Sequence, residues 1–269
     1  MAKYKKKRAR ELQHDRFRDT TMGFFDRLGD ALEGKGRTIL YALGGLLLAG
    51  ILVFAFVKWN HKKTDEARQA LGRAITITKA PVMATPVAGN NELTFTSDVE
   101  RAQKAIAEFE KVAAKYGDPY KTQSLYFIAS NRLVLDRPKG LSELEQLSKS
   151  NIAEVATLSK FALAQAKESD GKYDEAAQLY TEIARLNSPT ISAETANLRL
   201  AKVYEKQGKK KEAADLLFNM VDAARKAKGQ DNQPVPTSAA AREAADELQK
   251  LDPDRYAQLP PETPPLLAG

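Results

Sequence analysis

The chain has 269 residues and a formal net charge of +7. It contains no cysteine, which excludes disulfides, and only two histidines, so neither a soft-metal site nor another cofactor site is expected. The basic excess is local, because residues 1–37 hold 11 Lys and Arg against 6 Asp and Glu, whereas residues 58–269 hold 31 against 29. The large, nearly neutral segment is therefore not expected to bind nucleic acid.

The N-terminal tail, residues 1–37, combines a basic cluster with an amphipathic stretch. Residues 3–10 read KYKKKRAR. Such a basic cluster has two interpretations: it only sets the orientation of a membrane protein, or it also contacts anionic lipid or RNA. Residues 21–33 place four apolar side chains at helical spacing: Phe24, Phe25, Leu28 and Leu32. That pattern indicates either a short helix on the inner membrane surface or a tail without fixed structure.

The stretch from Ile39 to Val57 carries no charged residue. As a helix rising about 1.5 Å per residue, it would cover the hydrocarbon core of a bilayer, which is about 30 Å thick. A core helix of a soluble protein would normally carry a polar side, and this stretch has none. We predict a transmembrane helix over residues 38–58. A signal-peptide core is the alternative, and the long preceding tail argues against it.

Basic residues flank this segment unequally. The N-terminal side holds 11, whereas the next twenty residues beyond the apolar stretch hold five, namely Lys58, Lys62, Lys63, Arg68 and Arg73. The positive-inside rule then predicts a cytoplasmic N-terminus and an exported C-terminal domain. The expected location is thus the inner (plasma) membrane, crossed once, with the C-terminal domain periplasmic or otherwise extracytoplasmic. Within the span, small residues form one face that either contacts another membrane helix or only faces lipid: Ala42, Gly45 and Ala49.

Helical spacing continues beyond the span. Lys58 and Trp59 suit the far membrane interface, and apolar residues recur with a 3.6-residue period to about Lys79, so one long helix should leave the membrane. Residues 59–97 are thus assigned to a helical extension and a loop. Ser97-x-x-Glu100 matches a capping box that opens a helical domain over residues 98–251. A Pro-rich tail over residues 252–269 follows it.

The domain over 98–251 is predicted to be all-α. Gly, Pro and polar turns divide it into helices at about 98–116, 120–135, 153–169, 172–186, 191–207, 210–227 and 237–250, with a short helix around Leu144. Two parts of it repeat after 37 residues: Leu163, Ala164, Gly171, Ala176 and Leu179 recur as Leu200, Ala201, Gly208, Ala213 and Leu216. This order of helix, Gly turn and helix resembles the tetratricopeptide repeat of ~34 residues.

The arrangement as a whole resembles a known family. A basic tail, one span with Trp59 at its far end, a helix continuing outward and degenerate helical repeats are similar to the YfgM-like ancillary subunits of the bacterial Sec translocon. Short matches at Gly23-Phe24-Phe25 and at Trp59 with His61 accompany it. The resemblance implies a periplasmic repeat domain that associates with the export channel and with periplasmic chaperones. The loop at 80–97 and the C-terminal extension depart from that pattern.

In repeats of this kind the first helix of each pair lines a concave face, where extended peptides bind. Mapping the units predicts a partner-binding face made of eight residues: Tyr126, Asn131, Phe161, Gln165, Glu168, Leu198, Lys202 and Glu205. Glu168, Lys202 and Glu205 are expected to lie outside the packed interior. Apolar residues beside mixed polar groups suit loose binding to a peptide backbone, and the alternative is that these are ordinary surface residues.

Together these features predict a protein that is not an enzyme. No Gly-rich phosphate loop is present, and His14 and His61 lie on opposite sides of the predicted span, so no catalytic residue is assigned. The predicted function is a membrane-anchored protein–protein interaction module of the bacterial envelope, which the family resemblance places near the Sec translocon in the export or folding of translocated proteins. Its expected partners are exported clients, the Sec translocon or periplasmic chaperones, and membrane lipid. The alternative is a structural subunit of a large membrane complex, held through its span.

Overall fold

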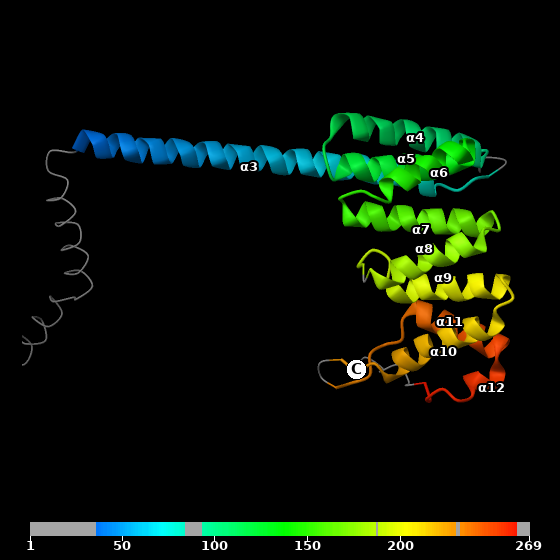
Figure 1. Cartoon of the computed structure of the whole chain (residues 1–269). Helices are drawn as coiled ribbons and strands as arrows, with labels where there is room; N and C mark the ends of the chain where they lie inside the picture. Colours follow the sequence, from blue (N-terminus) through cyan, green and yellow to red (C-terminus); the bar gives the residue numbers. More distant parts are fainter. Residues whose placement is uncertain (1–35, 84–92, 187, 230–231, 263–269) are drawn as a thin grey trace, which may run out of the picture. The chain divides into compact units, whose positions relative to one another are not determined.

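The computed structural model describes residues 36–83, 93–186, 188–229 and 232–262, and every regular element in these ranges is an α-helix (Figure 1). The helices are α3 (Gly36–Lys79), α4 (Asp98–Lys115), α5 (Tyr120–Leu135), α6 (Arg137–Leu147), α7 (Ala153–Ser169), α8 (Tyr173–Arg185), α9 (Ala193–Lys206), α10 (Lys210–Lys226), α11 (Ala239–Leu251) and α12 (Pro253–Tyr256). The predicted basic cluster at 3–10 and the amphipathic stretch at 21–33 lie outside the described residues.

Helix α3 is continuous from Gly36 to Lys79, as the spacing predicts. It passes from one compact unit, Met1–Asp65, into a second, Glu66–Gly269. Among the described residues it is the single helix long and apolar enough to cross a membrane, and no residue of its most apolar window is buried. The large side chains from Tyr41 to Val57 are all exposed, for example Leu46 at 71% and Phe54 at 69%.

The last turns of α3 belong to the core of the second unit. Ala67 and Ala74 are 2% and 1% exposed, and one hydrophobic cluster joins α3 to α4 and α5: Leu71, Ala74, Ala105, Phe109, Val112 and Ile128. Phe109 of α4 stacks on Phe127 of α5, with ring centroids 4.8 Å apart. The second unit therefore begins with the end of α3, well before the residue at which the sequence places the repeat domain.

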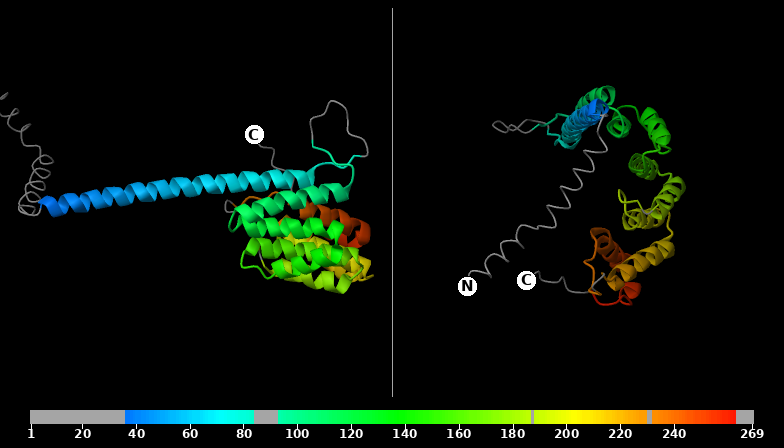
Figure 2. Two further views of the ribbon diagram at one scale, coloured as in Figure 1. Left: turned by 90° about the horizontal axis from the view of Figure 1, so that it is seen from above. Right: turned by 90° about the vertical axis from the view of Figure 1, so that its left-hand side faces the viewer.

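Helices of the second unit follow one another as antiparallel hairpins along a curved row (Figure 2). The turns of α7–α8 and α9–α10 use Gly171 and Gly208, with φ of 71° and 75°. Glycine adopts this left-handed conformation readily because it has no Cβ, and a residue in this conformation lets the chain turn sharply at the end of a helix. The amide of Lys172 donates to the carbonyl of Lys167 in the first turn, and the second turn repeats this bond 37 residues later.

Small residues at equivalent positions let the paired helices approach. Ala176 and Ala213 are both fully buried, as are Ala164 and Ala201. The 37-residue repeat seen in the sequence is thus confirmed as a packing repeat of helical hairpins.

The start of α4 is stabilised by a capping motif in the residues next to it. Ser97 Oγ accepts a hydrogen bond from the amide of Glu100, as the capping box predicts. The Glu100 carboxylate, however, accepts from the amide and hydroxyl of Thr96, one residue earlier than in the usual box. Those two bonds lower the pKa of the exposed Glu100 carboxyl.

Two short helices begin directly after longer ones end. The first, α6, is the short helix predicted around Leu144, and the second, α12, was not predicted. Asp136 caps α6 by accepting from the amide of Lys139, and Asp252 caps α12 by accepting from that of Arg255. In both helices a proline occupies the first turn, where its missing N–H costs nothing. Leu259, in the segment assigned to a Pro-rich tail, is 9% exposed and packs into the α9–α11 core.

Candidate partner-binding surface

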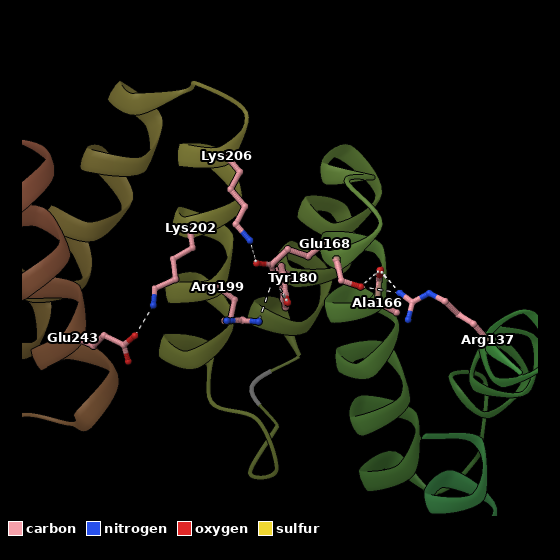
Figure 3. A network of polar contacts seen from close by, with 9 residues as sticks. Arg137, Ala166, Glu168, Tyr180, Arg199, Lys202, Lys206 and Glu243 are labelled. Carbon is pink, nitrogen blue, oxygen red and sulfur yellow. Dashed lines mark hydrogen bonds and ion pairs between the residues drawn. The ribbon is translucent and has the colours of Figure 1, made fainter. Parts of the chain in front are cut away.

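Glu168, at the end of α7, lies at the centre of a polar network between three helices (Figure 3). Its side chain is 7% exposed, so the expectation that it lies outside the packed interior is wrong. Tyr180 of α8 donates its hydroxyl to Oε2 at 3.0 Å, and Lys206 of α9 donates to Oε1 at 2.7 Å. The Arg199 guanidinium lies 3.2 Å from Oε2. Glu168 therefore joins one repeat to the next.

The network fixes the charge of its members. Burial by itself raises the pKa of Glu168, but the hydrogen bonds from Lys206 and Tyr180, together with the Arg199 charge, outweigh it and lower this pKa. Burial raises the pKa of Tyr180 to about 12, although Arg199 opposes the rise. At neutral pH the carboxylate is therefore charged and the phenol is neutral, which is the pairing that a phenol-to-carboxylate hydrogen bond requires.

Glu205 of α9 occupies the equivalent place in the next repeat, and its surroundings differ. It is half-buried, and its Oε1 has no hydrogen-bond partner in the described part of the chain. Burial and the nearby Glu247 carboxylate of α11 raise its pKa, while Lys202 and Lys250 partly offset that rise. Lys202, also predicted for the binding face, forms an ion pair with Glu243 of α11.

The other predicted residues divide by burial. Leu198 is 5% exposed and belongs to the core between α9, α10 and α11. Asn131 is 7% exposed, and its side-chain amide donates to the carbonyl of Phe127. Phe161 and Tyr126 are half-buried, Phe161 with its ring 5.7 Å from that of Tyr180. Of the eight predicted residues, Gln165 alone is exposed.

The accessible groups near these positions form a polar strip on α9 and α11, which we define by five residues: Arg199, Lys202, Lys206, Glu243 and Glu247. Lys206 and Glu243 keep 48% and 51% of their side-chain surface exposed. The sequence analysis missed Arg199, Lys206, Glu243 and Glu247. Their spacing in the sequence could have identified them. Arg199, Lys202 and Lys206 lie at i, i+3 and i+7 on α9, and Glu243 and Glu247 lie at i and i+4 on α11, so each set shares one side of its helix.

A partly apolar cavity of about 390 Å³ lies apart from this strip, between α5 and α6. Leu125, Ile128 and Leu147 line it, and the ion pair of Arg132 with Glu143 forms part of its wall. Such a cavity has room for one apolar side chain of a bound peptide. In the described residues no cluster of three or more His, Cys, Asp or Glu could hold a metal ion.

The small residues predicted to contact another membrane helix, Ala42, Gly45 and Ala49, are all exposed on α3. A side chain added at Gly45 would meet nothing within 4 Å. The face is open for a neighbouring helix.

No family model matches the sequence, and no curated protein matches it. Two solved structures are similar to it: the nearly identical TPR-like repeats of a kinesin light chain-like protein from Podosopora anserina, and a single-residue variant of the same protein. Each is 18% identical, covers 69% of this chain and 85% or 84% of its own, and has a TM-score of 0.48. A likeness at this level assigns no family, and the hairpin packing described above establishes the repeat architecture by itself.

Proposed function

We propose that this chain is a membrane-anchored, non-enzymatic protein–protein interaction module of a bacterial envelope. The observation that carries the proposal is the exposed apolar stretch of α3 from Tyr41 to Val57, which continues without a break into turns packed in the repeat unit. So large an apolar surface is unfavourable in water, and a bilayer is the solvent that matches it. Consecutive helical hairpins, in turn, offer an extended surface for polypeptide partners.

Membrane topology is the first test. The basic tail predicts a cytoplasmic N-terminus and repeats on the periplasmic side. Protease added to spheroplasts should remove everything beyond about Lys63 and spare the tail. A protected repeat unit would overturn the orientation, and a chain extracted by alkaline carbonate would overturn the anchoring.

Partner capture is the second test. The proposed partners are exported proteins near the Sec translocon, an assignment that rests on the family resemblance and on the predicted face of first helices, of which Gln165 is exposed. A photocrosslinking residue at the exposed Gln165 should form adducts with translocated polypeptides, whereas one at the exposed Lys211 of α10 should form few. Equal labelling at both positions would count against a defined binding face.

A structural subunit held through its span is the second candidate function. The small residues Ala42, Gly45 and Ala49 on one side of α3 favour it, since small residues let two membrane helices approach closely. Gly45→Leu with Ala49→Leu should then reduce co-purification of membrane partners. Gly44→Leu with Ala55→Leu is the matched control on another side of α3. Equal recovery of both variants would favour plain anchoring.

A further inference from the structure

Cationic side chains gather where the apolar stretch of α3 ends. Lys58, Lys62 and Lys63 follow Val57 within two turns, and all three are exposed. No acidic residue lies between Val57 and Thr64. We call Lys58, Lys62 and Lys63, together with Trp59, the collar.

The helix spreads the collar lysines around its axis. At 3.6 residues per turn, Lys58 and Lys62 point within roughly 40° of each other, and Lys63 points about 100° further round. The three ammonium groups therefore point toward more than one neighbouring headgroup position, from Cα atoms that span about 7.5 Å along the helix axis.

Trp59 is held within this collar. The Lys63 Nζ lies 3.7 Å from the centroid of its ring, and the Phe56 ring lies 6.5 Å away on the apolar side. An indole between an apolar side chain on the side of the apolar stretch and a cation on the other side suits the headgroup level of a bilayer.

The protein itself leaves the charge of the collar largely uncompensated. Across the described residues no carboxylate pairs with Lys58, Lys62 or Lys63. The nearest acidic residues along the helix, Asp65 and Glu66, follow Lys63 by two and three residues, and within the described part of the chain neither forms an ion pair with a collar lysine. Glu66 approaches Lys115 instead, at 3.9 Å.

We infer that the collar is a binding site for anionic phospholipid headgroups, with the lysine ammonium groups contacting lipid phosphates. The inference rests on the proposed membrane anchoring. Lysines at this depth extend their ammonium groups into the headgroup layer, where a net negative lipid replaces the counter-charge that the protein does not supply. A zwitterionic lipid presents the same phosphate but carries its own cation. The collar therefore selects lipids by net charge.

Trp59 provides the measurement, because it is the single tryptophan of the sequence. The full-length chain is reconstituted in mixed vesicles in which either phosphatidylglycerol or phosphatidylcholine carries brominated acyl chains, which quench nearby tryptophan. We expect brominated phosphatidylglycerol to quench more strongly at equal mole fraction, corresponding to a roughly three- to tenfold preference in association. Added salt should reduce this preference.

A triple variant, Lys58→Gln with Lys62→Gln and Lys63→Gln, should associate about equally with phosphatidylglycerol and phosphatidylcholine. The charge-matched control replaces three exposed lysines elsewhere, Lys121, Lys210 and Lys211, by Gln and should keep it. Equal quenching by both lipids in the unmodified chain would overturn the inference while leaving the anchoring intact. Absence of quenching by either lipid would instead overturn the anchoring itself. A preference that persists in the triple variant would place the lipid site elsewhere.

Discussion

Glu168 and Glu205 occupy the same position in successive repeats, 37 residues apart, and yet have opposite environments. Glu168 is buried and pairs with Tyr180, Arg199 and Lys206. Glu205 is half-buried beside another carboxylate, with one oxygen unpaired. The pKa of the first is lowered and that of the second is raised. A shared position in a repeat therefore does not fix the energetic role of a charged residue.

The difference comes from the neighbouring helices. The residue 37 positions after Tyr180 is Leu217, which is fully buried and has no hydroxyl to donate. Helix α9 turns two cations toward Glu168, whereas α11 brings Glu247 close to Glu205. The carboxylate of Glu168 consequently stabilises the junction of α7 and α8 with α9, whereas that of Glu205 destabilises the junction of α9 with α11.

The largest expected effect is the loss of Glu168. Glu168→Ala should lower the free energy of unfolding by about 2 kcal/mol, because it removes a buried, hydrogen-bonded charge and leaves Tyr180 without its acceptor. Chemical denaturation of the full chain in detergent, followed by circular dichroism at 222 nm, measures this loss. Gln165→Ala, on the same helix and exposed, is the matched control and should change little. Equal losses in the two variants would contradict the network.

The contribution of Glu168 should also depend on pH. Its pKa is lower in the folded state than the ordinary value of 4.5, so its stabilisation is fully present above about pH 4.5. It is lost as the pH falls through the lowered folded pKa. The stability difference between the unmodified chain and Glu168→Gln, measured from pH 7 downward, should therefore be constant at first and then shrink below pH 4.5. A difference that grows on acidification would contradict the assignment.

The glycine turns of the α7–α8 and α9–α10 hairpins have the same backbone conformation, which substitution can test. Gly171→Ala and Gly208→Ala should each lower the free energy of unfolding by about 1 kcal/mol, because both residues have positive φ. An added Cβ would meet no atom within 4 Å at either position, so no steric clash adds to this loss. Gly117→Ala is the control, since it too meets nothing within 4 Å and its φ is not positive. Thermal unfolding of the three variants compares them. Markedly different costs at the two turns would show that the backbone repeat is less regular than the structure indicates.

The smallest expected effect has the opposite sign. Glu205→Gln should raise the free energy of unfolding by roughly 0.5 kcal/mol at pH 7, because it removes repulsion from Glu247 and a charge that is partly desolvated. The raised folded pKa of Glu205 means that the unmodified chain gains stability as the pH falls through it, so the advantage should fade toward pH 4.5. A destabilised Glu205→Gln would show that its charge is useful in the fold.

The candidate surface could be predicted from sequence only in part. Periodicity identified the helices that supply Gln165 and Lys202, and both keep accessible surface. It could not show that Leu198 faces α10 and α11 or that Asn131 bonds back to its own helix, because burial depends on which neighbour covers each side. The short helix around Leu144 was predicted without its Asp136 cap, and α12 was missed because residues 252–269 were assigned to a Pro-rich tail.

The sequence by itself determined the uncharged stretch of α3, the helical hairpins and their 37-residue period. These depend on apolar periodicity, glycine conformation and capping, which act over a few residues. Only the tertiary structure decided that the end of α3 belongs to the repeat core and that Leu259 docks against α10 and α11. It also decided that Glu168 is paired while Glu205 is not. The reason is physical: the free energy of a buried charge is set by the groups that surround it in space, and those groups come from other helices.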